Sequence, residues 1–503
     1  MLCLVSVVSE TAAGLRNSTG RRGASCYDNA LCGAVAGARG PRTAHLTFTI
    51  TSPSLMSASK QAFAYSDDTL KQLVSDALTH ARSKGATAAD AEVSEGIGQT
   101  VTVRQGEVET IEYNRDKGMG VTVYIGRQRG HASSSDLSAQ AIRDTVEAAL
   151  AIARHTASDD CAGLADPDTL AREFPDLDLH HPWDMPVERA IEMAQACEAA
   201  GFAVDKRIGN SEGATVSTQQ SHFIYGNTHG FLAGFPSSRH SLWCALVAGK
   251  GDGMQRDDWY ETTRVPADLP PPEAIGRKAG ERAVARLKGR KIATTQAPVL
   301  FESGIAASLM GHFVSAVSGG SLYRKSSFLP DSLGQAVFAP CVQMTDSPLI
   351  PRGLASGAFD EEGVATQTRD VVKDGVVQGY FLATYSARKL GMKSTGNAGG
   401  NHNLSLADTG EDFAALLKKL GTGLLVTELM GQGVNGVTGD YSRGAAGFWV
   451  ENGVIAYPVE EITIAGNLKE MFKQIVAIGS DVSHRSSRQC GSILIERMKI
   501  AGS

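Results

Sequence analysis

The stretch Gly421–Gly453, GTGLLVTELMGQGVNGVTGDYSRGAAGFWVENG, is rich in glycine and places polar residues between apolar ones at roughly alternate positions. Alternation of this kind is typical of β-strands, and glycine within a strand marks a bulge or the close approach of another backbone. Four charged residues interrupt a segment that otherwise has the character of a buried strand: Glu428, Asp440, Arg443 and Glu451. Burying a charge is costly unless the charge is paired. The stretch is therefore either a turn-rich β-meander with charges at its edges or a functional surface.

The composition indicates a multidomain globular protein. The chain has 503 residues, of which 42% are hydrophobic and 20% charged, and no run approaches the roughly 18 apolar residues of a membrane-spanning helix. Its 55 glycines favour turns and bulged strands over a helical bundle. A net charge of −6 argues against a nucleic-acid-binding surface, and the 8 cysteines, with no CxxC pair, suit a reducing cytoplasm.

Residues 1–65 differ from the rest of the chain. The first fifty-five residues are rich in arginine, serine and glycine, are poor in acidic residues, and show no helical or alternating pattern. We interpret residues 1–65 as a disordered or mis-started tail, with Met56 as a natural beginning.

Residues 66–160 form the first predicted domain, of α+β type. Leu70, Val74 and Ala77 share one face of a helix that begins at Ser66–Thr69 and ends near Gly85. Residues 91–129 then alternate with a period of two, which predicts an antiparallel meander with turns at Gly106 and Gly118. A second helix is expected to be capped at Ser135–Asp136.

A Pro/Asp-rich connection, residues 161–184, leads to a middle α+β domain at 182–290. There we expect a helix from Pro186, strands within 207–262 and a helix over Glu273–Leu287.

A third, β-rich domain is predicted at 296–503. It should open with a strand at 298–301 and a helix from Ser303 to about Val317. Asp374–Gly375 and Asn452–Gly453 are each flanked by Val or Ile, which predicts type I′ hairpins. The sequence thus predicts a multidomain α+β protein with a β-rich C-terminal domain.

The residues alone do not define a reaction. A helical zinc-peptidase motif requires a Glu directly after its first His, and none of the 12 histidines is followed by Glu. His312 lies alone on an apolar helix, and the adjacent His180 and His181 should point apart. The stretch Gly353–Gly357 only resembles a serine nucleophile elbow. Gly431, Gly433 and Gly436 spell GxGxxG, but strand-like residues follow them rather than a helix.

Cysteine chemistry is an open alternative. Cys341 or Cys490 could act as a thiol nucleophile, although a buried, inert cysteine is the more common role for such a residue. A thiol hydrolase is therefore retained as one hypothesis.

From about Asp68 to the C-terminus, the chain closely resembles the PmbA (TldE) branch of the TldD/PmbA family. The motifs that carry the resemblance are long, and they include GMGVTVYIG, DKRIGNSEG, GGSLYRKSSFLPDSLG, TYSARKLGMKSTGNAGG, GTGLLVTELMGQGV, TGDYSRGAAGFWVENG and QCGSILIERMKIAG.

The resemblance implies a cytoplasmic, heteromeric metalloprotease that cleaves unfolded or extended peptides, including peptide-antibiotic precursors and an antitoxin. In such an assembly a TldD-like partner carries the HExxxH helix and the zinc-type metal. The equivalent helix in this chain is Ser303–Ser318, which lacks that motif, so we expect no catalytic residue, no metal and no cofactor here. Cys490 matches in place a cysteine of the partner's site and remains only a vestigial metal candidate.

The resemblance also suggests a role for the glycine-rich stretch. We expect it to line the substrate chamber or the subunit interface, with no nucleic acid or membrane bound and with a homodimer possible when the chain is isolated. The candidate substrate or interface residues are Glu428, Asp440, Tyr441, Arg443 and Glu451. The alternative is a non-catalytic regulatory protein that acts on DNA gyrase or on an RNA-binding regulator.

Overall fold

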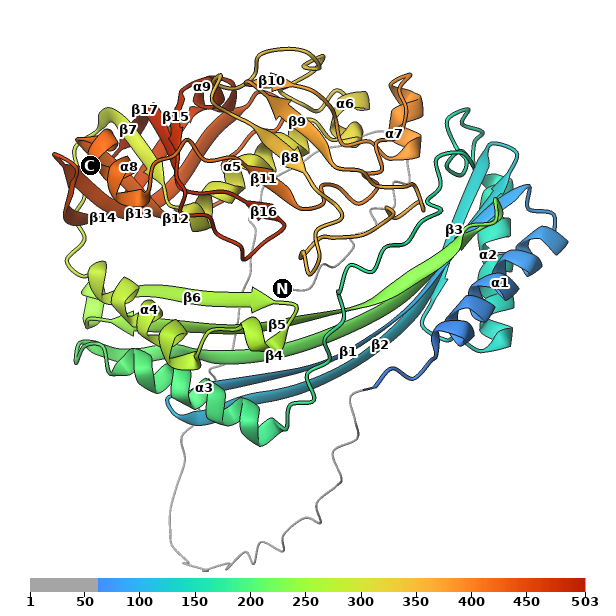
Figure 1. Cartoon of the computed structure of the whole chain (residues 1–503), viewed down its shortest axis with the longest axis horizontal. Helices are drawn as coiled ribbons and strands as arrows, with labels where there is room; N and C mark the ends of the chain where they lie inside the picture. The colour runs from blue at the N-terminus through green and yellow to red at the C-terminus, as the bar shows by residue number, and fades with distance from the viewer. Residues whose placement is uncertain (1–61, 503) are drawn as a thin grey trace, which may run out of the picture. The chain divides into compact units, whose positions relative to one another are not determined.

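The computed structural model describes residues 62–502 (Figure 1). The expectations for the N-terminal tail and for Met56 lie outside the described residues, except at the tail's end. There the backbone N–H groups of Ala64 and Tyr65 donate to the Glu95 carboxylate over 2.8 and 3.1 Å. These last residues of the predicted tail are therefore bound to the first sheet.

Six long antiparallel strands form that sheet, in the order β3-β2-β1-β4-β5-β6. Strands of the predicted first and middle domains are thus joined through the pairing of β1 with β4. The strands are β1 (Ala88–Arg104), β2 (Glu107–Ile125), β3 (Gln128–Ser134), β4 (Ile208–Asn227), β5 (Leu232–Ala248) and β6 (Gln255–Thr263).

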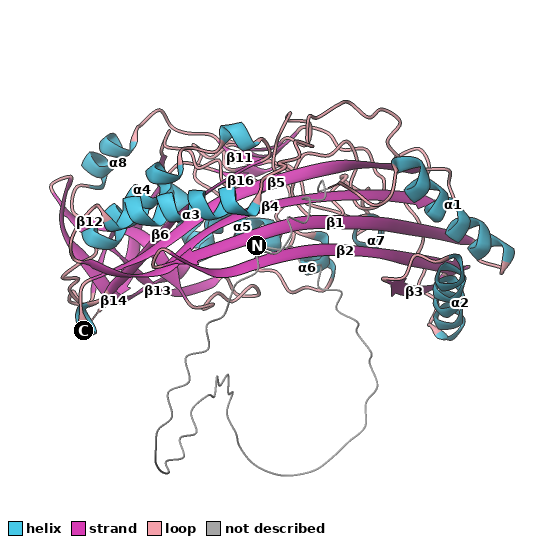
Figure 2. Ribbon diagram, turned by 90° about the horizontal axis from the view of Figure 1, so that it is seen from below, coloured by secondary structure: helices cyan, strands magenta, loops and turns pink. Residues whose placement is uncertain are grey.

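Four helices cover one face of this sheet, two at each end (Figure 2). Every second side chain of β1 points to this face of the sheet. Ala91 and Val93 therefore pack under one pair of helices, and Val101 and Val103 pack under the other pair. The first pair is α1 (Asp67–Ser83) and α2 (Ala139–His155), and the second is α3 (Val187–Phe202) and α4 (Pro272–Ala285). Short 3₁₀ turns lie at Gly251–Gly253 and Pro266–Asp268.

The predicted helices are confirmed, with one corrected cap. Ser66 caps α1 by accepting from the N–H of Thr69. The cap of α2 is Ser138, whose hydroxyl accepts from Ala141, and not Ser135–Asp136 as predicted. Asp136 instead accepts from the N–H of Ser138, and so it orders the turn that precedes the helix.

The predicted turn at Gly118 is wrong. Strand β2 runs without interruption from Glu107 to Ile125, and Gly118 pairs with Ser94 of β1. Of the two glycines predicted to form turns, only Gly106 does so, with a positive φ of 79°. A glycine within a strand can mark close backbone packing as well as a turn, and the pairing with distant residues decides between the two.

The C-terminal part contains two sheets around one large apolar core. The six-stranded sheet has the order β14-β13-β12-β7-β17-β15, and the five-stranded sheet has the order β10-β9-β8-β11-β16. The strands are β7 (Thr295–Phe301), β8 (Met344–Asp346), β9 (Arg369–Lys373), β10 (Val376–Val377), β11 (Leu404–Leu406), β12 (Gly423–Met430), β13 (Asp440–Glu451), β14 (Val454–Asn467), β15 (Ile475–Ile478), β16 (Arg488–Gln489) and β17 (Ile493–Ala501).

Helix α5 (Ser303–Ala316) packs its buried face into this core, as the sequence predicts. The other helices are short: α6 (Gly319–Tyr323), α7 (Thr384–Lys389), α8 (Phe413–Leu420) and α9 (Leu468–Lys473). Both Asx-Gly hairpins are confirmed, since Asp374, Gly375, Asn452 and Gly453 all have positive φ.

The chain is therefore a mixed α+β protein with antiparallel sheets, which confirms the predicted fold class. Among the helices of residues 62–502, none has the length and apolar character needed to cross a membrane.

Candidate functional site

A cleft of about 360 Å³ lies beside the first half of α5. Its walls come from β6 of the first sheet and from helix α4, which packs on that sheet. They also come from α5, β12 and β13 of the C-terminal part, and from the loop that carries Arg485. The lining residues are Arg256, Asp257, Asp258, Trp259, Tyr260, Arg282, Glu302, Gly304, Ile305, Ser308, Thr427, Glu428, Leu429, Arg443 and Arg485. Its size lies at the lower end of the range for ligand-binding pockets.

Arg282 of α4 and Arg286, which directly follows this helix, neutralise carboxylates that line the cleft. Arg282 contacts Asp257 at 3.0 Å and Glu302 at 2.7 Å, while Arg286 pairs with Glu428. These carboxylates raise the pKa of Arg282 against the opposing effect of its burial. The network joins α4 of the first sheet to the start of α5 and to β12, so it also connects the two halves of the described chain.

The predicted candidates divide into two groups. Glu428 and Arg443 line the cleft, whereas Asp440, Tyr441 and Glu451 do not. None of the four charged residues in the glycine-rich stretch is buried, because each lies on a solvent-facing or cleft-facing position of its strand. The stretch therefore contains no buried charge that would need a partner.

Asp440 and Tyr441 have local structural contacts. Asp440 accepts from Thr438 at 2.7 Å and from Asn467 at 3.0 Å, which lowers its pKa and ties the start of β13 to the end of β14. Tyr441 is 1% exposed, and burial raises its pKa to about 12. Its hydroxyl has no hydrogen-bond partner among the described residues.

Two arginines lie against the face of α5 that carries Gly304 and Gly311. A Cβ on Gly304 would lie 2.9 Å from Nη2 of Arg485, and one on Gly311 would lie 3.3 Å from Nη1 of Arg488. Both glycines thus leave room for a guanidinium group. His312 follows Gly311, with its Nε2 buried and without a partner in the described structure. Burial, together with the charges of Arg443 and Arg488, lowers the pKa of His312.

This surface does not fit a metal ion. A protein zinc site uses three or four His, Cys or carboxylate ligands, and within residues 62–502 no three such side chains cluster in a metal-binding arrangement. The cationic groups of Arg443 and Arg488 near His312 would also repel a divalent cation.

Neither candidate thiol has the surroundings of a nucleophile. Cys490 is fully buried, and burial together with Asp481 raises its pKa to about 12. Cys341 is exposed, but partial burial of its thiol raises its pKa too. A reactive thiol has a lowered pKa, so these surroundings disfavour a nucleophilic role for either cysteine.

The other motifs considered from sequence have structural partners. His180 contacts Gln220 and His181 contacts Asp178, so the two rings do not form a pair. The hydroxyl of Ser356 donates to the carbonyl of Ile350 within its own loop. As predicted, strand β13 rather than a helix follows the GxGxxG stretch.

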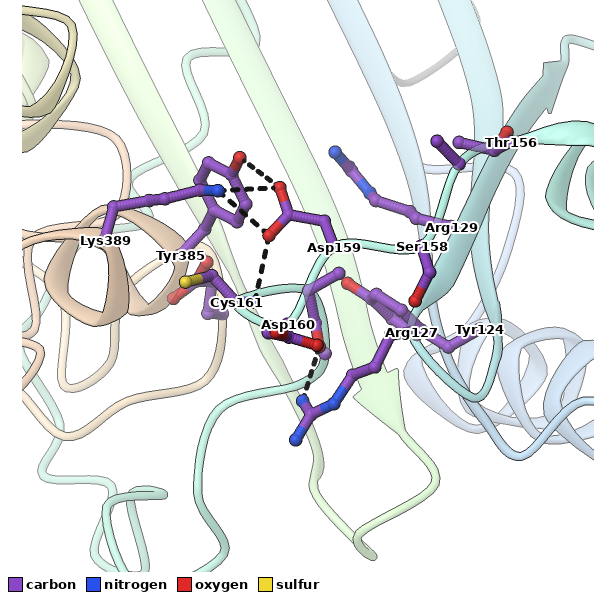
Figure 3. Close-up of a pocket in the computed structure, with 14 residues that line it drawn as sticks. Tyr124, Arg127, Arg129, Thr156, Ser158, Asp159, Asp160, Cys161, Tyr385 and Lys389 are labelled. Carbon is purple, nitrogen blue, oxygen red and sulfur yellow. Dashed lines mark hydrogen bonds and ion pairs between the residues drawn. The ribbon is translucent and has the colours of Figure 1, made fainter.

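A second concave region, of about 770 Å³, lies between β2, residues 156–163 and α7 (Figure 3). Several of its side chains bind one another or nearby backbone: Asp159 contacts Lys389 and Tyr385, and Arg127 donates to the carbonyl of Ala162. The bonds of Asp159 lower its pKa to about 2. These contacts attach the connection after α2 to the C-terminal part, so we assign the region a structural role.

Sequence reasoning missed the cleft residues Trp259, Arg282 and Arg485, and also Arg488, which lies beside Gly311 of α5. They come from segments separated by more than two hundred positions. A lone Trp or Arg in such a segment carries no spacing signal, and only the arrangement of residues 480–490 against α5 and β6 brings them together.

Comparison with known proteins gives matches along most of the chain. Three domains of the PmbA/TldA metallopeptidases match this chain: domain 1 matches residues 89–153, the central domain matches residues 180–287, and the C-terminal domain matches residues 294–502. The chain is 51% identical to the metalloprotease PmbA of Escherichia coli O157:H7, over 86% of this chain and 96% of that protein. It is 22% identical to a metalloprotease TldD homolog of Haemophilus influenzae, over 74% of this chain and 81% of that protein.

A solved structure from Bacteroides thetaiotaomicron, described as a proposed modulator of DNA gyrase, superimposes with a TM-score of 0.83 at 26% identity. The match covers 87% of this chain and 100% of that one.

Proposed function

Because the chain belongs to the PmbA/TldD metallopeptidase family, we propose that it is the metal-free subunit of a cytoplasmic, two-component peptidase. A TldD-like subunit would supply the HExxxH helix and the metal. This chain would supply one wall of the chamber in which an unfolded or extended peptide is cleaved.

The observation that carries the proposal is the surface of α5. The family resemblance places the metal-binding helix here, yet glycines and a single imidazole face arginine side chains. Such a surface favours anions over metal ions. A family member with this surface would depend on another chain for metal chemistry.

Strand β12 supports the peptide-binding part of the proposal. Strand β7 pairs only with Leu424–Val426, so Glu428–Met430 is paired with β13 alone among the described strands. Thr427, Glu428 and Leu429 line the cleft. An extended peptide could therefore add to this strand through backbone hydrogen bonds, which require no particular side-chain sequence.

The β13–β14 hairpin is our candidate for the subunit contact. Val454 is 67% exposed at its tip, beside the exposed Glu451 and Ile455. Exposed apolar side chains grouped on one hairpin are typical of a protein contact.

To test the proposal, the chain and its TldD-like partner should be purified separately and together. We expect an unfolded peptide to be cleaved only by the mixture, and the two chains to elute as one complex. Cleavage by this chain alone would overturn the assignment. Capture of DNA gyrase without any TldD-like chain would favour the regulatory alternative instead.

A further inference from the structure

We propose that Arg443 and Arg485 bind the free α-carboxylate at the C-terminal end of a peptide in the cleft beside α5. This inference rests on the proposed function, since it takes the cleft to be a peptide site. It adds a chemical preference that backbone pairing alone does not provide.

The first argument is the charge balance of the cleft. Its four carboxylates all have arginine partners: Arg282 for Asp257 and Glu302, Arg286 for Glu428, and Arg256 for Asp258 at 2.6 Å. Arg443 and Arg485 also line the cleft, and neither forms an ion pair with a carboxylate of the described residues. Two cations are therefore available to an anionic ligand.

Arg485 is held in an orientation suited to that ligand. Its guanidinium group lies 3.9 Å from the ring centre of Trp259 and 4.8 Å from that of Tyr260. Its Nε donates to Ser483 at 3.1 Å. Stacking uses the face of the guanidinium group, and Nη1 donates to the carbonyl of Tyr260 at 3.5 Å, which leaves the N–H groups of Nη2 available in its plane. No acceptor for Nη2 is found among the described residues, and this atom lies beside Gly304.

Arg443 lies at the end of the exposed strand edge. Its Nε donates to the carbonyl of Met430 at 3.2 Å, and its two Nη atoms have no acceptor among the described residues. A peptide paired with Glu428–Met430 would reach these donors with its last residue. The last residue of a peptide carries both a backbone N–H and the terminal carboxylate. One chain end can therefore contact both the strand and the guanidinium groups.

The start of α5 favours the same ligand. Gly304 and Ile305 of its first turn line the cleft, and the N-terminal end of a helix carries a partial positive charge. Arg488 lies farther along the same face, beside Gly311, and adds to the positive potential. The anion would therefore bind where the two arginines and a helix end meet, with Arg488 nearby.

The test uses the isolated full-length chain and peptides of one unfolded sequence, each with a dye at its N-terminus. One peptide has a free C-terminal carboxylate, the second is amidated, and the third is amidated but carries an internal glutamate. We expect the free acid to bind at least about tenfold more tightly than either amide, by fluorescence anisotropy. This preference should shrink with increasing salt.

Two variants make the assignment specific. The double variant R443Q/R485Q should bind all three peptides with the same, weak affinity. The control Arg189→Gln, which removes an exposed arginine of α3 that pairs with Glu192, should keep the preference. Equal binding of free acid and amide by the parent chain overturns the inference, and tighter binding of the glutamate peptide overturns the choice of a terminal carboxylate.

Failure of this inference can be told apart from failure of the proposed function. If the complex with the TldD-like chain cleaves amidated and free-acid peptides equally well, the carboxylate site is wrong and the subunit assignment stands. If no complex forms, the assignment is wrong and the binding data are interpreted on their own.

Discussion

The guanidinium group of Arg485 occupies the space beside Gly304 of α5, with Nη2 only 2.9 Å from the position that a Cβ on this glycine would take. A helix would ordinarily be more stable with alanine than with glycine at such a position. Gly304 therefore keeps the surface of α5 open for an arginine at some cost in helix stability.

Replacing Gly304 with alanine separates binding from stability. The Cβ would displace the end of a flexible arginine rather than backbone, so the melting temperature should stay unchanged or rise slightly. Binding of a free-acid peptide should weaken severalfold, because Nη2 of Arg485 moves away. The control is Gly209→Ala, where a Cβ meets nothing within 4 Å. Unchanged peptide binding by the Gly304 variant would show that the position of Arg485 does not matter.

Arg282→Met tests the connection between the two halves. The substitution leaves Asp257 and Glu302, with side chains 10% and 23% exposed, without their main partner. We expect a loss of about 3 kcal/mol in the free energy of unfolding, since breaking a largely buried ion pair typically costs that much. Denaturation in urea measures it, with Arg189→Met in an exposed pair as the control, expected to change stability by less than about 1 kcal/mol.

Asp90 predicts a pH dependence of stability. Burial raises the pKa of this carboxyl in β1 from 3.8 to about 7, although a hydrogen bond from Thr122 and the charge of Arg129 oppose the shift. The folded chain thus binds this proton more tightly than the unfolded chain. The contribution of Asp90 to the free energy of unfolding is therefore fully present below about pH 4 and is lost as the pH rises through about 7.

The variant Asp90→Asn removes this titration. Its free energy of unfolding, relative to that of the parent chain, should increase between about pH 4 and 7 and then level off. Urea denaturation at several pH values measures the difference. A difference that stays constant across this range would mean that the folded Asp90 ionises normally.

Local signals explain what the sequence predicts well. The cap of α1 and the apolar faces of α1 and α5 depend on residues three or four positions apart, and the Asx-Gly hairpins depend on two adjacent residues. These features are set before any distant contact forms. For the same reason, the sequence identifies Glu428 and Arg443 as unusual charges in a strand.

Long-range pairing explains what the sequence does not predict. Gly118 looks like a turn until its partner Ser94 is known, and the first sheet joins segments that the sequence presents as separate domains. The partner of Glu428 is Arg286, and Arg485 reaches Trp259 only through the folded loop. No local pattern carries these contacts, so the charge balance of the cleft could not be foreseen.

The cysteines offer a test of the thiol alternative. Under native conditions, Cys341 should react with iodoacetamide well before the buried Cys490, as followed by mass spectrometry of the resulting peptides. Neither C341S nor C490A should reduce cleavage by the complex with the TldD-like chain. Loss of cleavage in C490A, in a variant that still folds and assembles, would support a role for this thiol.

The most direct test of the central claim is the metal content of the two chains. After incubation with zinc and removal of excess metal, mass spectrometry of the elements should find far less than one zinc per isolated chain and about one per assembled pair. One zinc per isolated chain, lost in the variant His312→Ala, would contradict the assignment of this chain as the metal-free subunit.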